Sequence, residues 1–351
     1  MVLYKFQHMN YINKEKAKLV WTQNDWDIKH FEAKKKVLKF PDNSANINQA
    51  SKWGKVILKK FSSSFYTVTR LLPEKKKKDV QIIYAAVRYP DEVVDSFNLS
   101  NSEKVQILKK FESDFIRSKK YKNIYEMLNN NISLTIAGFR DVCNRYKMPE
   151  KYYMAFLEAM KKDIEPRQYK DWNDLIDNYI YGSATVVGYF LSYIYGHSKT
   201  SSLKECMETS KSLAIALQLT NFARDVSEDA IRGRCYLPKD QKDYKNQIIY
   251  NGVIKKNVDD IISAKLLLAE EAKKWYEKCS NKIDNFTEDS RLAIQACHTL
   301  YSKLNNKILK KENNFQRESL SVIEKFSVIP KNQYLKLAIA LVMNKWKINY
   351  L

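Results

Sequence analysis

Apolar residues recur at steps of three and four positions along most of the 351-residue chain, which is the spacing of one face of an α-helix. Only 7 glycines and 7 prolines interrupt the pattern, so regular structure is expected to be long and seldom broken. The pattern predicts an all-α fold, and a hydrophobic content of 44% is ample for a substantial core. The length permits one large domain or two small ones.

The prolines divide the chain into segments with helical periodicity. Residues 1–45 are interpreted as an N-terminal extension that packs on the main body, with one short helix over 27–38 that Pro41 ends. Residues 46–351 are interpreted as one main domain. Its predicted helices cover 46–61, 74–97, 101–146, 150–162, 172–197, 213–229, 257–283, 287–311 and 333–346.

A row of polar residues follows one face of the predicted helix over 213–229. Gln218, Asn221, Asp225 and Asp229 step by three, four and four positions, so they share a face. Two aspartates one turn apart repel each other by roughly 3 kcal/mol at an effective dielectric near 20. A divalent cation removes that repulsion, and Mg²⁺ commonly binds one or two carboxylates together with substrate phosphates. The row indicates a metal–phosphate site, but on spacing alone a solvated acidic face explains it equally well.

The predicted helix over 74–97 repeats this geometry. Tyr84, Arg88, Asp91 and Asp95 recur by four, three and four positions on one face, while apolar residues form the other. Two helices that each carry an aspartate pair, with an arginine one turn from one pair, can clamp Mg²⁺ and a diphosphate between them. Pro90 lies within this helix and is expected to bend it near Asp91.

Two other features have two interpretations each. Ser62 to Ser64 supply hydroxyls that either hold a phosphate oxygen or cap a helix, and capping is the commoner use. Tyr301 is a core tyrosine unless it points into a cavity. Asp163 falls in a connecting turn and needs no catalytic role.

The segment 178–196 carries no charge, so it is expected to be central in the fold. Ala184, Gly188 and Ser192 form a stripe of small residues along it. Such a stripe either lets another helix approach closely or leaves room for an apolar ligand. Packing is the default interpretation, although a cavity wall is also consistent with the absence of charge.

The net charge of +21 favours an anionic partner such as nucleic acid, a membrane surface or a phosphorylated substrate, but a biased composition rich in lysine explains it too. The 5 cysteines form no CxxC pair, which indicates neither a zinc site nor a disulfide framework and fits a reducing cytosol. No apolar run approaches the length of a membrane-spanning helix. A cytoplasmic protein, soluble or peripheral at a membrane, is therefore expected.

The motifs together resemble the squalene and phytoene synthase family. The sequence YAAVRYPDEVVD at 84–95 is similar to the family's first aspartate-rich motif, and LQLTNFARDVSEDAIRGRCYLP at 217–238 to its second. YIYGSATVVG at 179–188 resembles the segment between them, and Ser62 to Tyr66 followed by LLP also matches. The resemblance covers roughly residues 46–346 in the family's order.

The resemblance implies a single all-α isoprenoid-synthase domain with a central apolar cavity and an acidic mouth. It implies that Mg²⁺, with Mn²⁺ as a substitute, is held by Asp91, Asp95, Asn221, Asp225 and Asp229. It assigns contacts to the prenyl diphosphate to Ser62, Ser63, Ser64, Tyr84, Arg88, Gln218, Arg224 and Tyr301. Arg88 and the four aspartates form the implied catalytic set.

Some residues depart from the family's pattern. Where the family often has His-Ser-Lys-Ser-Phe, this chain has Phe61 to Phe65 with Ser63 at the lysine position, so a diphosphate-binding lysine is absent or replaced. Asn314 stands where a late glycine is frequent.

The implied reaction is head-to-head condensation of two identical allylic diphosphates through a cyclopropylcarbinyl diphosphate to a linear polyene. The product is phytoene-like, from two C20 substrates, or dehydrosqualene, from two C15 substrates. The alternative within the family is squalene synthesis with NADPH as a cofactor. A basic helical protein that binds nucleic acid or a membrane is a more distant alternative, and it does not explain four inward-facing aspartates. No nucleic-acid partner is therefore expected.

Overall fold

The computed structural model describes residues 21–39, 41–165, 167–239, 244–310, 315 and 317–328. Within these ranges every regular element is a helix, and His197 and Phe286 form one isolated antiparallel bridge. The prediction of an all-α fold is confirmed. The predicted helix over 333–346 and the departure at Asn314 lie outside the described residues.

The elements follow one another along the chain as α2 (Gln23–Leu38), α3 (Asn43–Phe61), α4 (Ser63–Thr69), α5 (Glu74–Asp95), α6 (Asn101–Ser118), α7 (Ile124–Asn129), α8 (Leu134–Tyr146), α9 (Glu150–Lys162), α10 (Trp172–Leu175), the π-helix η1 (Ile176–Thr185), α11 (Val186–Tyr195), α12 (Leu203–Ile231), α13 (Tyr244–Ile254), α14 (Val258–Ser280), the 3₁₀ turn η2 (Ile283–Asn285), α15 (Glu288–Lys310) and α16 (Val322–Phe326). Most of the predicted helices are present with similar bounds. The predicted helix over 101–146 is instead three helices, because Asn123 and Ser133 each cap a new helix start.

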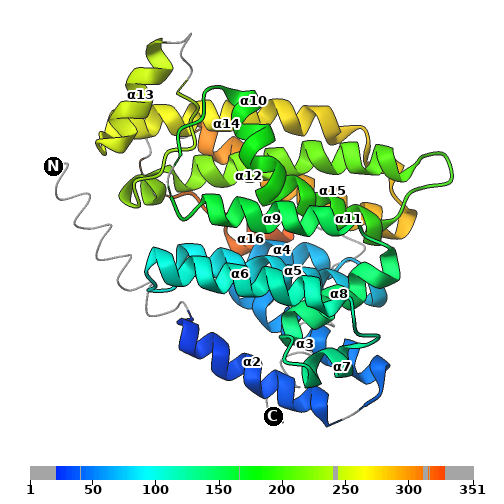
Figure 1. The fold of residues 1–351 in the computed structure, drawn as a ribbon. Coiled ribbons are helices and arrows are strands. Elements are labelled where there is room, and N and C mark those ends of the chain that lie inside the picture. Colours follow the sequence, from blue (N-terminus) through cyan, green and yellow to red (C-terminus); the bar gives the residue numbers. More distant parts are fainter. Residues whose placement is uncertain are drawn as a thin grey trace.

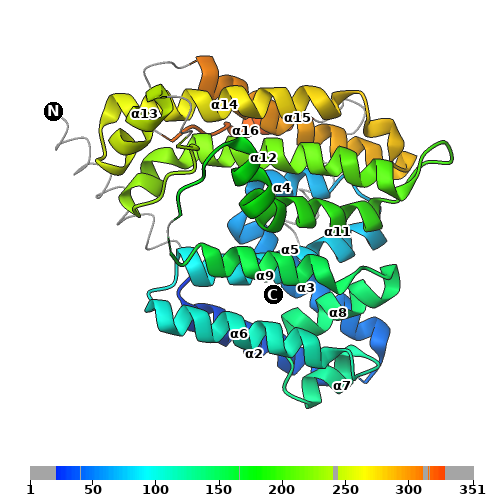
Figure 2. The same ribbon diagram turned by 45° about the horizontal axis from the view of Figure 1, so that its top comes forward.

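The helices form two packed groups with the cavity between them. Helices α2, α3 and α7 lie on one side of the molecule and α13 and α14 on the other (Figures 1 and 2). Each group has its own cluster of buried apolar side chains. Helix α11 packs against both α5 and α12, so it joins the groups. This arrangement places α5 and α12, the two helices with aspartate pairs, in facing groups.

Helix α2 packs on the body of the protein. Trp26 is 2% exposed and its ring lies 5.5 Å from that of Trp53 on α3. Thr22 and Asp25 form a capping box that starts the helix. His30 accepts a hydrogen bond of 3.1 Å from the backbone N–H of Leu134. These contacts hold α2 against α3 and α8.

The uncharged segment is central, as predicted, but its first part is a π-helix. At Gly182 in η1, an added Cβ would lie 2.6 Å from the Ala155 carbonyl oxygen, so glycine allows α9 to approach closely. The spacing of apolar residues does not predict this wider turn, and π-helical turns are rare in proteins. Helix α11 then continues to Tyr195.

The stripe of small residues seats α12, in agreement with the packing interpretation. The Ser192 hydroxyl is fully buried and donates a hydrogen bond of 2.7 Å to Ser210 on α12. A Cβ at Gly188 would lie 3.1 Å from the Ser210 carbonyl oxygen. Ala184 and Gly188 also reach the cavity wall, whereas Ser192 does not line it. The cavity interpretation is therefore wrong at Ser192.

Candidate active site

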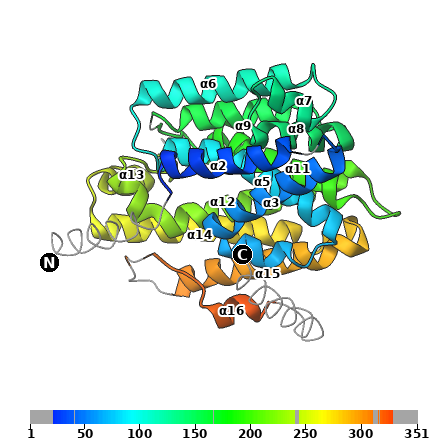
Figure 3. The same ribbon diagram turned by 90° about the horizontal axis from the view of Figure 1, so that it is seen from below.

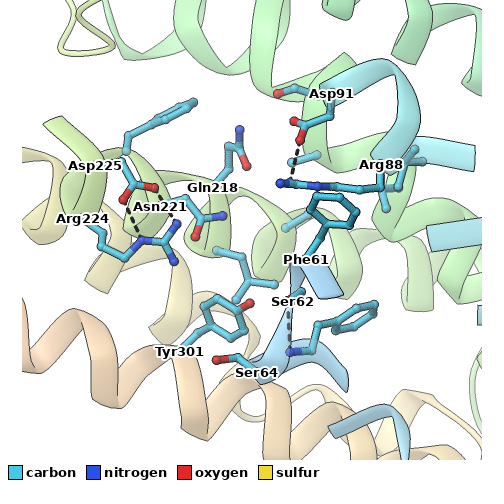
Figure 4. Close-up of a pocket in the computed structure, with 18 of the residues that line it drawn as sticks. Phe61, Ser62, Ser64, Arg88, Asp91, Gln218, Asn221, Arg224, Asp225 and Tyr301 are labelled. Atoms are coloured by element: carbon cyan, nitrogen blue, oxygen red, sulfur yellow. Dashed lines mark hydrogen bonds and ion pairs between the residues drawn. The ribbon is translucent and has the colours of Figure 1, made fainter. Parts of the chain in front are cut away.

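A cavity of about 650 Å³ lies between the two groups of helices. Every site residue proposed from the sequence lines it: Ser62, Ser63, Ser64, Tyr84, Arg88, Asp91, Asp95, Gln218, Asn221, Arg224, Asp225, Asp229 and Tyr301. Figure 4 shows Arg88 and Asp91 of α5 facing Arg224 and Asp225 of α12, with Gln218 and Asn221 between them. The solvated-face interpretation of the two polar rows is therefore wrong, since both rows face one interior space.

The α5 wall carries one arginine beside several carboxylates. Arg88 Nη1 lies 2.6 Å from Asp91 Oδ2, and the same guanidinium pairs with the buried Glu92. The Phe61 ring lies 5.0 Å from the Arg88 guanidinium, which holds it beside α5. Burial raises the pKa of Asp91 to about 6; nearby Asp95 acts in the same direction, and Arg88 opposes it. The helix continues through Pro90 to Asp95, and the bend expected near Asp91 stays a prediction.

The α12 wall holds two aspartates whose environments push their pKa values apart. Burial would raise the pKa of Asp225, but Arg224, at 2.5 Å, and Arg317, at 2.6 Å, outweigh it and lower the pKa to about 2. Burial and the charge of Asp225 raise the pKa of Asp229 to about 8. A second negative charge beside Asp225 is therefore unfavourable, and this repulsion keeps Asp229 protonated up to a higher pH than an ordinary aspartate. A bound cation would relieve this repulsion.

The donor set fits a hard divalent cation. Carboxylate and amide oxygens are the ligands that Mg²⁺ prefers, and Asp91, Asp95, Asn221, Asp225 and Asp229 present them to one cavity. As the side chains stand, no three acidic, histidine or cysteine residues of the described ranges converge closely enough to hold an ion. Asp91, Asp95 and Asp225 are instead each paired with an arginine.

The arginines that follow α12 close this acidic mouth. Arg234 Nη1 donates a hydrogen bond of 2.6 Å to Asp95 Oδ1. Arg232 lies 3.8 Å from both Asp95 and Asp229, and so bridges the two motifs. These contacts connect the end of α5 to the end of α12.

Hydroxyl groups of Ser62, Ser64 and Tyr301 line another part of the cavity. Ser62 caps α4, and its Oγ accepts a hydrogen bond of 3.3 Å from the backbone N–H of Phe65. Tyr301 lines the cavity near Ser62 and Ser64 rather than standing in a closed core (Figure 4). Burial raises the pKa of Tyr301 to about 12, so it is a neutral donor at pH 7.

A cation occupies the place where the family's lysine is missing. Lys325 Nζ on α16 donates a hydrogen bond of 2.9 Å to Ser63 Oγ. Helix α16 lies beside α15 (Figure 3), and Lys307 of α15 pairs with Glu324 of α16 at 3.3 Å. The ammonium group of Lys325 thus lies beside Ser63, although the two residues are far apart in the sequence.

Several residues of this site escaped the sequence analysis. Arg317 and Lys325 carry no motif or periodic signal, because they come from a short C-terminal segment that folds back over the cavity. Arg232 and Arg234 lie within the second motif, but the spacing of the polar row does not include them. Asp163, to which the sequence gave no role, also lines the cavity.

The rest of the cavity wall is apolar and aromatic. The Phe222 and Tyr236 rings stack with centroids 4.0 Å apart, and Tyr179 stacks on Tyr236 at 5.3 Å. Leu191 and Leu213 contribute aliphatic surface. The cavity thus combines a charged mouth with an interior suited to hydrocarbon chains.

Comparison with known proteins identifies related sequences and similar folds. A 15-cis-phytoene synthase of Enterobacter agglomerans is 28% identical over 276 residues, which cover 76% of this chain and 90% of that protein. The 15-cis-phytoene synthase of Pantoea ananas is 26% identical over 271 residues, covering 76% and 86%. Among solved structures, a dehydrosqualene synthase in complex with ligand aligns with a TM-score of 0.69 at 24% identity, over 84% of this chain and 99% of the other.

A squalene synthase from Alicyclobacillus acidocaldarius aligns with a TM-score of 0.62 at 16% identity, over 76% of this chain and 96% of the other. At these identities the structures support the fold alone. The family model for squalene/phytoene synthase matches residues 58–324, a range that includes both aspartate motifs, the π-helix and Tyr301. This protein therefore belongs to the squalene/phytoene synthase family.

Proposed function

We propose that this protein is a prenyltransferase that condenses two identical allylic diphosphates head to head and releases diphosphate. The observation that carries the proposal is the pairing of α5 and α12, whose acidic rows face each other across the mouth of an otherwise apolar cavity. Such a mouth suits a metal-bound diphosphate, and such an interior suits two prenyl chains. Membership of the squalene/phytoene synthase family supports the same reaction.

In this proposal, Asp91, Asp95, Asn221, Asp225 and Asp229 hold Mg²⁺. When bound, the metal neutralises charge that develops on the departing diphosphate. Arg88, Arg224, Arg317 and Lys325 supply further positive charge around the same space. Tyr84, Gln218, Tyr301 and Ser62 to Ser64 offer neutral hydrogen-bonding groups that orient the diphosphate oxygens.

The bond changes follow from departure of the diphosphate. The C–O bond of one substrate breaks to leave an allylic cation, and the double bond of the other attacks it to form a new C–C bond. Loss of a proton closes the cyclopropane ring, and a second ionisation with rearrangement and proton loss gives the linear polyene. Apolar and aromatic side chains of the wall, among them Tyr179, Phe222 and Tyr236, help to exclude water that would quench these cations.

A phytoene-like product from two C20 diphosphates is the first candidate, because the most similar curated relatives considered above are phytoene synthases. Dehydrosqualene from two C15 diphosphates is the second. Reductive synthesis with NADPH has less support.

We also propose how the chain is organised and where it acts. Residues 46–351 form the catalytic domain, and the preceding residues form an extension whose α2 packs on it. Among the described helices, none has the length and apolar character that crossing a bilayer requires. The net charge of +21 and the lipid nature of substrate and product favour a cytoplasmic protein that works at an anionic membrane surface.

One experiment tests the reaction directly. The full-length protein is incubated with C15 or C20 prenyl diphosphate, with and without NADPH, in Mg²⁺ or in EDTA, and the products are identified. We expect Mg²⁺-dependent diphosphate release and an unreduced polyene that does not require NADPH. Turnover to squalene only when NADPH is present would support the alternative, and no diphosphate release from either substrate would reject both.

A further inference from the structure

Asp163 is an acidic residue of the cavity that the proposed function leaves unused. It directly follows α9 and contributes to the cavity wall. Its Oδ2 accepts a hydrogen bond of 2.5 Å from the Tyr179 hydroxyl, and its Oδ1 accepts one of 3.3 Å from the Tyr236 hydroxyl. Both tyrosines line the same cavity. The Asp163 carboxylate is therefore connected to the cavity interior through phenol groups.

This environment differs from that of the acidic mouth. Asp91, Asp95 and Asp225 each pair with an arginine side chain, whereas no lysine or arginine side chain of the described residues pairs with the Asp163 carboxylate. The contact between Arg234 and Asp163 runs instead to the backbone carbonyl, at 2.9 Å. A carboxylate held by hydroxyl donors is free to take up a proton without breaking an ion pair.

The bond between Tyr179 and Asp163 is suited to proton movement. Charge-assisted O–H to carboxylate bonds are short, and this one is at the short end of the range. Burial raises the pKa of Asp163 to about 7, although the hydrogen bond from Tyr179 and the charge of Arg234 oppose the shift. A group that titrates near neutral pH can accept a proton in one step and return it to water in the next.

We propose that Asp163, acting through the Tyr179 hydroxyl, receives a proton that a prenyl carbocation loses in this cavity. The inference rests on the proposed function, because that reaction needs an acceptor for the protons lost from carbon. Within the pair, Tyr179 is the group at the reacting atoms and Asp163 is the positioning residue and final proton holder.

The step balances without a further reactant. A C–H bond beside the cationic carbon breaks, and its electron pair forms the new carbon–carbon bond. The Tyr179 oxygen takes the proton while the original Tyr179 O–H proton passes to Asp163 Oδ2. Asp163 ends as a neutral carboxylic acid and Tyr179 is unchanged. Release of that proton to water after the product leaves restores the carboxylate.

Other titratable and charged groups face Asp163 from several elements. They are Tyr179 on η1, Arg234 and Tyr236 after α12, Tyr169 before α10, and Asp91 and Asp95 on α5. The α5 carboxylates raise the pKa of Asp163 and Arg234 lowers it. Because these groups remain in a variant at position 163, comparison with the wild type isolates the titration of Asp163 itself.

The test measures kcat against pH for the full-length wild type, Asp163→Asn and Tyr179→Phe at saturating prenyl diphosphate and Mg²⁺. We expect wild-type kcat to fall as pH decreases through about 7, because a protonated Asp163 cannot accept the proton. Each variant should lose about 100-fold or more in kcat, the range of general-base contributions, with little change in KM. In Asp163→Asn this decline on the acid side should disappear, and Asp163→Glu should recover part of the rate.

Tyr169→Phe is the matched control. Its ring lies 5.7 Å from that of Tyr179, but the residue does not line the cavity, so kcat should be unchanged. Tyr179→Phe keeps the stacked ring, so it still tests the proposal if Asp163→Asn fails to fold. Near-wild-type kcat in both Asp163→Asn and Tyr179→Phe overturns the proposed proton transfer. It is also overturned if Asp163→Asn has a reduced kcat that still declines at acid pH and Asp163→Glu recovers none of the rate. Failure of the proposed function is a separate result, in which the wild type itself releases no diphosphate.

Discussion

Lys325 and Ser63 are separated by 262 positions in the sequence, yet their side chains meet in a hydrogen bond of 2.9 Å at the edge of the cavity. The contact places an ammonium group beside the residue that stands where the family often has lysine. We propose that this charge from α16 compensates for the serine at position 63. The neighbouring Arg317 reaches Asp225 from the same C-terminal segment.

The first prediction follows from this compensation. Lys325→Ala should lower kcat/KM for the prenyl diphosphate by about 10- to 100-fold, because a charge-assisted hydrogen bond to a diphosphate oxygen is lost. Ser63→Lys in the Lys325→Ala background should restore most of it. Lys303→Ala is the control, since Lys303 binds Ser327 of the same segment at 3.0 Å but does not line the cavity. Equal losses in the two single variants would show that the segment acts through its fold rather than through the charge of Lys325.

The second prediction concerns the metal. Asp91→Asn or Asp225→Asn should reduce turnover by several orders of magnitude, and EDTA should abolish it, because the departing diphosphate then lacks charge neutralisation. The thermal unfolding midpoint of Asp91→Asn should change little, because burial already disfavours the charged form of Asp91. Asp225→Asn should lower the midpoint, because it leaves Arg224 and Arg317 without their carboxylate partner. Asp284→Asn, whose side chain is 88% exposed, is the control and should be fully active. Near-normal activity in EDTA would falsify the metal assignment.

The third prediction uses His30. Burial and the nearby charge of Lys34 lower the pKa of His30 to about 4. The folded state then holds a neutral imidazole, while the unfolded chain gains a proton below its ordinary pKa of 6.5. The stability contribution is therefore present above pH 6.5 and is lost as pH falls toward 4, by up to about 2–3 kcal/mol. Urea unfolding of the wild type and His30→Gln at several pH values checks this. Parallel pH profiles for the two proteins would contradict it.

The fourth prediction concerns the membrane surface. The full-length protein should float with anionic liposomes at low salt and be released at high salt, because a net charge of +21 binds through screened electrostatic attraction. Neutral liposomes of the same size are the control. Equal binding to both kinds of liposome would reject an electrostatic mechanism.

The sequence predicts those site residues that repeat at helical spacing along one face of a helix. Tyr84, Arg88, Asp91 and Asp95 repeat along one helix face, so their common position could be predicted before any tertiary contact was known. Lys325, Arg317 and Asp163 could not, because their places depend on how a turn and a late segment fold over the cavity. The short α13 and α16 were missed because neither gives a long enough apolar pattern.

The last prediction separates packing from cavity shape in the stripe of small residues. Gly188 faces the backbone of α12, where an added Cβ would lie 3.1 Å from the Ser210 carbonyl oxygen and 3.3 Å from the Ala214 Cβ. Gly188→Leu should therefore overpack this contact and cost about 1–3 kcal/mol, seen as a lowered thermal midpoint. Ala184 lines the cavity and already carries a Cβ, so a larger side chain there can extend into the space for the prenyl chains.

Ala184→Leu should accordingly keep the midpoint near that of the wild type and lower kcat/KM for C20 diphosphate more than for C15. Both variants are measured on matched preparations, with midpoint and substrate ratio determined together. A changed ratio in Gly188→Leu at an unchanged midpoint would mean that position 188 shapes the cavity more than the helix contact. A lowered midpoint in Ala184→Leu with an unchanged ratio would mean that position 184 is a packing residue as well, and that chain length is set elsewhere along the wall.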